Sequence, residues 1–262
     1  MRKTFLHIQG IGPRREYAIW RRGISSWKEA LRVDLSWLGK RAERVRKGAE
    51  ISELYLRIGE AGFFSQRLPP AERLRLWPEF GEDAAFLDIE TDPFRITVVG
   101  LYFHGKYRVF VRGKDLWRFP QFLRQAKLVV TYNGSAFDLP VILRAFYGGK
   151  KPAEWPQPEI FNPPRGVHLP GKGHVDLKPI LHARGIKGGL KASEEILGIR
   201  RPGEVAGLDG ADAVLLWQRY EQGEEKALDL LIEYNRQDVV NLAKIIEILL
   251  QEQEEAAGRT GT

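Results

Sequence analysis

The stretch Ala84-Ala85-Phe86-Leu87-Asp88-Ile89-Glu90 decides the fold. Four apolar residues come first, and two acids follow at alternate positions. Side chains alternate between the two faces of a strand, so Asp88 and Glu90 share one face. A buried strand seldom ends in two acids on the same face unless they have a partner. The stretch therefore predicts a central strand that ends at a pair of carboxylates.

Two further segments bring acids to fixed positions. The apolar run 128–132 ends just before Asn133 to Asp138 (N-G-S-A-F-D), and Asp138 is expected to open the next helix. Tyr234 to Asp238 (Y-N-R-Q-D) lies within a long helical pattern, where a spacing of four stacks Tyr234 and Asp238 on one side. Four carboxylates in one place repel each other unless a cation neutralises them. Oxygen ligands of this kind suit magnesium or manganese.

The order D-x-E, N-x-x-x-F-D and Y-x-x-x-D resembles the DnaQ-like 3′–5′ exonucleases of the DEDDy subgroup. The proofreading domains of family B DNA polymerases share this pattern, and the chain is most similar to the stand-alone YprB-type proteins with a ribonuclease H-like domain. The resemblance covers roughly residues 84–250. A sister subgroup has histidine where this chain has Glu233, so the tyrosine version matches better.

The resemblance implies phosphodiester hydrolysis with two Mg²⁺ or Mn²⁺ ions about 4 Å apart. Asp88 would bridge the ions, Glu90 and Asp238 would complete the first site, and Asp138 would hold the second. Tyr234 would orient the attacking water, although a phenol is a poor base at neutral pH. The resemblance also implies that Thr91, Asn133 and Phe137 contact nucleic acid. Phe137 is expected to pack behind the site, and Asn133 to brace its turn.

Each motif also has an ordinary structural interpretation. Asp138 alone could be a helix N-cap, with Pro140 in the first turn. Tyr234 could be a core aromatic residue, and Asp238 a solvated charge near Arg236. The whole domain could be an inactive scaffold that still binds nucleic acid, or an exoribonuclease that trims RNA. Single-stranded nucleic acid is the expected substrate, with DNA favoured over RNA.

Composition limits the possible classes of protein. The 262 residues suit one domain of ordinary size with an appendage, and 43% are hydrophobic. The chain has no cysteine, and its five histidines lack the spacing of a zinc site. It has neither an apolar stretch that would span a membrane nor the apolar core of a signal peptide. We therefore expect a cytoplasmic protein without membrane contact.

Positive charge is concentrated at the front of the chain. Residues 1–50 hold 13 Lys and Arg against five Asp and Glu, whereas the formal charge of the whole chain is +7. The turn Gly10-Ile11-Gly12 with Arg14 and Arg15 resembles a helix-hairpin-helix element, or half of one, whose free N–H groups would bind a phosphate. The alternative is a solvated helix face, with Trp20 and Trp27 packing a small core.

The remaining sequence predicts an α/β fold. We expect strands at 84–90, 95–103, 106–112, 127–132 and 174–177, the first three as an antiparallel meander and the fourth parallel to the first. Helices are expected at 35–59, 117–126 and 138–147, and 148–173 as a long surface loop with Lys150, Lys151, Arg165 and Lys172 facing phosphates. This is a ribonuclease H-like mixed five-stranded sheet flanked by helices. The expected domains are a small all-helical N-terminal domain (1–80), the nuclease domain (81–252) and a frayed tail (253–262).

Overall fold

The computed structural model describes residues 1–93, 95–148, 160–162 and 165–259. The sheet has five strands in the order β3-β2-β1-β4-β5. The strands are β1 (Ala84–Thr91), β2 (Ile96–Phe103), β3 (Lys106–Val111), β4 (Leu128–Thr131) and β5 (Gly173–Asp176). Strands β1, β2 and β3 pair antiparallel, while β4 runs parallel to both β1 and β5. The predicted mixed sheet is therefore confirmed.

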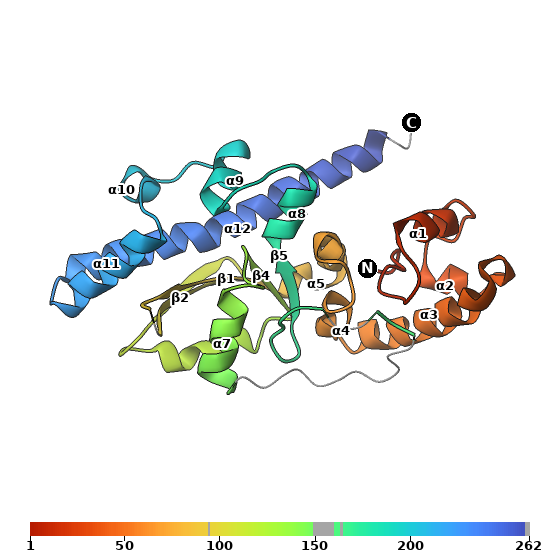
Figure 1. Cartoon of the computed structure of the whole chain (residues 1–262), viewed down its shortest axis with the longest axis horizontal. Coiled ribbons are helices and arrows are strands. Elements are labelled where there is room, and N and C mark those ends of the chain that lie inside the picture. The colour runs from red at the N-terminus through yellow and green to blue at the C-terminus, as the bar shows by residue number, and fades with distance from the viewer. Residues whose placement is uncertain (94, 149–159, 163–164, 260–262) are drawn as a thin grey trace.

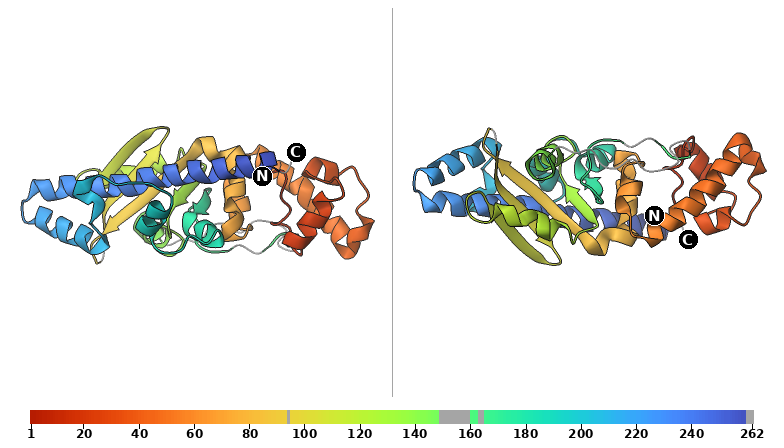
Figure 2. Two further views of the ribbon diagram at one scale, coloured as in Figure 1. Left: turned by 90° about the horizontal axis from the view of Figure 1, so that it is seen from above. Right: turned by 90° about the horizontal axis from the view of Figure 1, so that it is seen from below.

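Helices cover both faces of the sheet (Figure 1). On one face lie η4 (Leu116–Arg118), α6 (Phe119–Leu123) and α7 (Asp138–Tyr147). Over the other face lie α8 (Leu177–Ala183), α9 (Leu190–Ile196), α10 (Gly203–Ala206), α11 (Gly210–Glu221) and α12 (Glu225–Arg259). Helix α12 runs from the end of the molecule that it shares with α11 towards the N-terminal region (Figure 2). It continues past residue 252, because the segment Q-E-Q-E-E-A-A is rich in strong helix formers.

The two faces of β1 have different neighbours, as the alternation predicts. Ala85, Leu87 and Ile89 belong to the hydrophobic core that includes α6 and α7. Ala84 and Phe86 belong to the core beneath α12, and Asp88 and Glu90 follow at the same alternate positions. The acids therefore lie on the face that α12 covers.

The N-terminal region is helical, with α1 (Pro13–Trp20), α2 (Trp27–Ala30), η1 (Ser36–Arg41), α3 (Ala42–Arg57), α4 (Ala61–Ser65), η2 (Pro70–Leu76), α5 (Trp77–Phe80) and η3 (Gly81–Asp83). The single helix expected over 35–59 is divided, because Gly39 has a left-handed φ of 56°. Residues 1–9 contain no helix, so the turn at Gly10 opens α1 and does not join two described helices as a full helix-hairpin-helix would.

One hydrophobic core continues across the expected boundary at residue 80. It includes Phe5 and Trp27 of the N-terminal region together with Leu128 and Val175 of the sheet. Helix α4 packs directly on β5, where a Cβ at Gly173 would lie 2.8 Å from the Cβ of Ala61. The residues before position 81 therefore form part of the covering of the β5 edge.

The segment expected as a surface loop is partly buried. Ile160, Phe161 and Leu169 are buried, and Phe161 forms a β-bridge with Ile8 of the N-terminal region. Apolar side chains in a Pro- and Gly-rich stretch gave no periodic signal, which is why the sequence predicted only a loop. Lys172 donates to the carbonyl oxygens of Arg124 and Ala126 and is held against α6, whereas Arg165 is exposed. Lys150 and Lys151 lie outside the described residues.

Candidate active site

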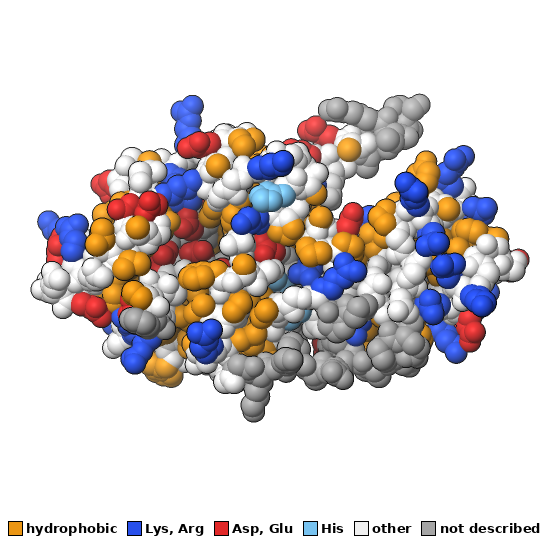
Figure 3. Space-filling model, in the orientation of Figure 1, with side chains coloured by type: hydrophobic (Ala, Val, Ile, Leu, Met, Phe, Trp, Pro, Cys, Tyr) orange, Lys and Arg blue, Asp and Glu red, His pale blue; other side chains and the backbone are white. Residues whose placement is uncertain are grey.

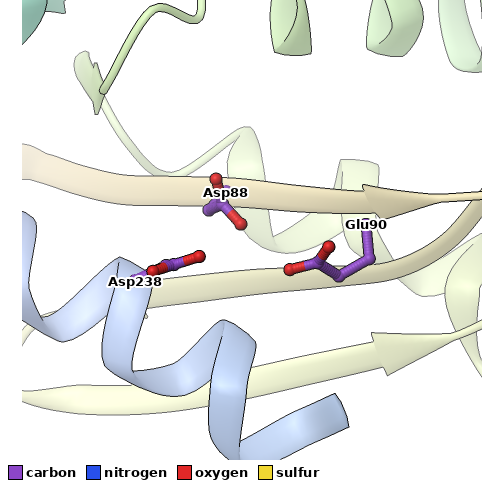
Figure 4. A group of neighbouring side chains, drawn as sticks. All are labelled: Asp88, Glu90 and Asp238. Carbon is purple, nitrogen blue, oxygen red and sulfur yellow. The ribbon is translucent and has the colours of Figure 1, made fainter. Parts of the chain in front are cut away.

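Three carboxylates meet where β1 passes under α12. Ligand atoms of Asp88, Glu90 and Asp238 lie within 4.8 Å of one another. Asp88 and Glu90 project from the same face of β1, and Asp238 reaches them from α12 (Figure 4). In the space-filling view, Asp and Glu side chains line a hollow in the surface between the sheet and the helices above it (Figure 3). The predicted convergence of these acids is therefore present in the fold.

Asn235 links the two acids of β1, a contact that was not expected. Its Nδ2 donates to Asp88 Oδ2 at 3.0 Å and to Glu90 Oε1 at 3.3 Å, while its Oδ1 accepts from the Tyr107 hydroxyl at 3.0 Å. A Cβ at Gly100 would lie only 1.9 Å from Asn235 Oδ1. Position 100 must therefore be glycine for α12 to place its asparagine between the acids.

Asp138 is the fourth acid, and it is not an N-cap. Helix α7 begins at Asp138 itself, and the N-cap residue Phe137 makes no side-chain cap. The side chain is 3% exposed, and its Oδ1 has no hydrogen-bond partner. Burial raises the pKa of Asp138 to about 7, although the nearby backbone N–H groups of Asp138 and Ile89 oppose the shift. A buried acceptor oxygen without a partner is costly, which favours a ligand at this position.

Burial and mutual repulsion raise the pKa values of the acids. Burial, followed by repulsion from Glu90 and Asp238, raises the pKa of Asp88 well above its ordinary value. Burial and then Asp238 raise the pKa of Glu90 to about 8. Desolvated carboxylates with such shifts need a proton or a cation to share the site. All the donor atoms are hard oxygens, so the residues fit a divalent cation such as magnesium or manganese.

Asp238 has a cationic partner that the sequence did not reveal. Arg201 donates to Asp238 Oδ1 through Nη2, and its side chain is 5% exposed. The same guanidinium forms a fork with Glu194, with Nε–Oε2 at 2.5 Å and Nη2–Oε1 at 2.8 Å. Burial raises the pKa of Asp238 even though Arg201 opposes the shift. In the sequence, the segment I-R-R-P-G reads as an exposed connection, and no periodicity marks which arginine is buried.

Tyr234 lies beside Asp238 and is 7% exposed. Its hydroxyl lies close enough to Asp238 to lower the pKa of that carboxyl, so the ring contributes to the core and the hydroxyl to the site. The Lys191 ammonium lies 5.4 Å from the ring centroid. Burial raises the pKa of the phenol, followed in effect by the negative charge of Asp238. The hydroxyl therefore remains protonated at neutral pH and acts as a hydrogen-bond donor.

The other expected contact residues differ in position. Phe137 does not pack behind the site: it is 45% exposed and, with Thr91, lines a neighbouring cavity of about 440 Å³ that also includes Arg95 and Arg144. The exposed position follows from the N-cap conformation of Phe137, which places its backbone outside the helix.

Asn133 braces its turn, as expected. Its φ is 62°, its N–H donates to Asp176 Oδ1 at 2.8 Å, and its side-chain oxygen accepts from Lys178. The turn that leads from β4 towards Asp138 is therefore tied to the end of β5.

The expected phosphate-binding turn lies far from the acids, at the end of the molecule formed by α1 to α3 (Figure 1). Gly10 has a φ of 80°, and its carbonyl accepts from Arg15 Nη1 at 3.1 Å. Gly12 is the N-cap of α1 and provides no side-chain cap, and Arg14 is exposed. Arg41 of η1 lies against Gly10, where a Cβ would be 3.4 Å from its Nε.

No described helix is long and apolar enough to cross a membrane.

A mixed sheet in this order, with acids gathered at its centre, defines an α/β protein of the ribonuclease H-like class. The profile of the RNase H superfamily matches residues 85–250, so the chain belongs to this superfamily. A solved family B DNA polymerase from the hyperthermophilic archaeon Pyrobaculum calidifontis is 22% identical, with a TM-score of 0.48. The match covers 64% of this chain and 24% of that polymerase chain. No curated protein matches the sequence.

Proposed function

We propose that the protein is a metal-dependent 3′–5′ exonuclease that hydrolyses single-stranded nucleic acid, with DNA favoured over RNA. The convergence of Asp88, Glu90 and Asp238 within 4.8 Å is the observation that supports this most strongly. The order of the three motifs, which resembles the DEDDy exonucleases and the YprB-type proteins, supports the direction of cleavage. Membership of the RNase H superfamily supports a nuclease acting on nucleic acid.

In this proposal, Asp88, Glu90, Asp138 and Asp238 hold two divalent cations. When bound, these cations neutralise the acids, acidify a water molecule and polarise the phosphodiester. Asn235 keeps Asp88 and Glu90 aligned through its shared amide group. The Tyr234 hydroxyl lies beside Asp238, where it can orient the attacking water. Its raised pKa is consistent with an orienting role and not with that of a base.

Substrate contacts are proposed at two places. Exposed Phe137 and neighbouring Thr91 would contact the end of the strand, since an exposed aromatic ring can stack on a base. Gly10, Gly12, Arg14 and Arg15 would contact phosphates further along, because the region carries a surplus of positive charge. Asn133 serves the substrate indirectly, since its side chain is bonded to Lys178.

The test uses single-stranded DNA and RNA oligonucleotides of one sequence, labelled at the 5′ end and resolved nucleotide by nucleotide. With Mg²⁺ or Mn²⁺ we expect a ladder that shortens from the 3′ end, and no products with EDTA. A 3′-phosphorothioate end should stall the ladder, which provides the control for direction. Immediate release of the labelled 5′ nucleotide, or internal cuts, would overturn the proposed direction. Cleavage of RNA alone would favour the exoribonuclease, and binding without cleavage the inactive module.

A further inference from the structure

Among the four acids, Asp238 differs in its partners. Asp88 and Glu90 accept from the neutral amide of Asn235, and Asp138 Oδ1 is buried without a hydrogen-bond partner. Asp238 instead accepts from the guanidinium of Arg201. It also comes from α12, whereas Asp88 and Glu90 come from β1. Asp238, which reaches from the helix layer towards the two acids of the sheet, is therefore the acid that forms an ion pair.

Arg201 is itself held in place. Glu194 of α9 grips it with two hydrogen bonds of 2.5 and 2.8 Å and is 1% exposed. Asn241 of α12 donates to Glu194 Oε1 at 3.0 Å and is fully buried. Asn241 and Asp238 are three residues apart on α12, so both ends of the hydrogen-bonded network lie on this helix. A planar guanidinium in such a fork has little freedom, and a lysine could not reproduce the fork.

The network is expensive for a purely structural contact. It places a guanidinium and two carboxylates in the interior, and Arg201 Nη1 is buried with no hydrogen-bond partner. Such groups contribute little net stability compared with apolar residues of the same volume. Without Arg201, repulsion from Asp88 and Glu90 would favour rotamers that turn Asp238 away from them. A role in fixing the geometry of Asp238 would explain why this unfavourable network is present.

We infer that Arg201, clamped by Glu194 and Asn241, is a positioning residue that orients Asp238 for cation binding. The inference rests on the proposed function, because it takes Asp238 as a ligand. It assigns Arg201 no contact with the substrate. Partners that orient carboxylate ligands commonly change metal affinity by about 10- to 100-fold when they are replaced.

The experiment measures Mn²⁺ binding to the intact protein, without nucleic acid, from the electron paramagnetic resonance signal of free Mn²⁺. Arg201→Lys keeps the charge and loses the fork, so Mn²⁺ affinity should fall by about 10- to 100-fold. Glu194→Gln releases half of the clamp and should cause a smaller loss in the same direction. Arg200→Lys is the matched control, because Arg200 is exposed and adjacent, and it should bind as the wild type does.

Kinetics with saturating Mn²⁺ give a second readout. Arg201→Lys should lower kcat for an oligonucleotide while KM stays within about threefold, since the residue does not touch the substrate. Wild-type Mn²⁺ affinity in both Arg201→Lys and Glu194→Gln, or tighter binding in either, would overturn the inference. If Arg201→Lys does not fold, Glu194→Gln alone decides. Wild-type protein that binds Mn²⁺ but hydrolyses nothing refutes the proposed function and leaves the binding comparison valid, whereas no Mn²⁺ binding refutes both.

Discussion

The acidic cluster beneath α12 and the basic surface of residues 1–50 differ in their contact with water. Glu90, Asp138 and Asp238 are 8%, 3% and 6% exposed, whereas Arg14 and Arg15 are exposed on α1. Figure 3 shows the same difference, with acids in a hollow and Lys and Arg spread over the N-terminal helices. Exposed charges cost little because water solvates them, whereas buried like charges must be compensated.

The one buried acid of the N-terminal helices supports this contrast. Glu16 is 1% exposed and is fully engaged by Thr4 Oγ1, the Phe5 N–H and Arg75. Arg75, which also pairs with Glu72, supplies the positive charge beside Glu16, so this acid needs no bound metal ion. Burial of one paired acid is structural, whereas three buried acids gathered with the half-buried Asp88 indicate a binding site. The comparison predicts specific, local effects for the cluster and diffuse, salt-dependent effects for the surface.

The largest expected effect is that of Asp88→Asn. The change removes a charge at the centre of the cluster and keeps the shape, so hydrolysis should fall by at least about a thousandfold, equivalent to several kcal/mol of transition-state stabilisation. Thermal unfolding should stay cooperative, and in EDTA the midpoint should not fall, because repulsion is relieved. Asp83→Asn, at a partly exposed acid just before β1, is the control and should retain activity. Near wild-type turnover in Asp88→Asn would falsify the metal-site assignment.

Tyr234→Phe should have the next largest effect. It removes the one hydroxyl beside Asp238, and the rate should fall by roughly one to three orders of magnitude. Mn²⁺ affinity and the unfolding midpoint should change little, because the ring still fills the core. Tyr220→Phe on α11 controls for loss of a phenol elsewhere. A loss of stability that parallels the loss of activity would mean that Tyr234 is a packing residue.

Stability in EDTA should depend on pH in two opposite ways. The pKa values of Asp138 and Glu90 are raised by burial to about 7 and about 8, so the folded state keeps protons that the unfolded chain releases near pH 4. Stability should therefore fall as the pH rises from about 4 to about 8.

Burial lowers the pKa of His7 to about 3 and that of His168 to about 4, so stability should also fall as the pH drops below about 6.5.

These two opposite trends predict that stability is greatest between about pH 5 and 7. The measurement is the urea midpoint of unfolding across pH 4 to 9. Mn²⁺ should restore stability most at pH 8. It should restore stability least at pH 5, because at pH 5 it competes with protons bound to the acids. In Asp88→Asn the alkaline fall should be shallower. An alkaline limb that neither Mn²⁺ nor Asp88→Asn changes would show that the acids do not cause it.

The smallest effect is expected at the basic surface. Replacing both Arg14 and Arg15 by Gln should weaken binding of single-stranded oligonucleotides a few-fold, regardless of sequence. Each lost phosphate contact should reduce the slope of log affinity against log salt by about 0.7. Replacing Lys106 and Lys226, which are exposed outside the N-terminal region, removes the same charge and should leave the slope unchanged. Equal slopes in both double variants would show that only net charge matters, which would contradict a local contact.

Alternation and spacing predicted the parts of this molecule that depend on short stretches. A period of 2 residues predicted which face of β1 carries the acids, and a period of about 3.6 residues predicted that Tyr234 and Asp238 share one side of their helix. The end of the apolar run before Asn133 predicted the first residue of α7. Arg201 and Asn235 were missed because their importance arises from the approach of separate elements. The fork of Arg201 needs α9 beside α12, and the place of Asn235 needs a glycine at position 100 of β2. No local pattern encodes such distances.

The two misplaced features have equally physical causes. Phe137 was expected to pack behind the site, but the N-cap conformation turns it towards solvent. Residues 160–162 were expected in a surface loop, yet Phe161 is buried against His7 and Phe63. Burial there depends on a pairing with the N-terminal region, whose apolar residues lie about 150 positions earlier in the chain.

That pairing has a consequence for synthesis on the ribosome. The Gln9 N–H donates to the Ile160 carbonyl, and the Asn162 N–H donates to the His7 carbonyl, so residues 7–9 are completed by residues made much later. During translation, Ile8 must wait without Phe161 while about 150 residues are added between them. Such distant contacts slow folding and leave apolar surface available to other chains. The nascent N-terminal region is therefore where a chaperone would be needed first.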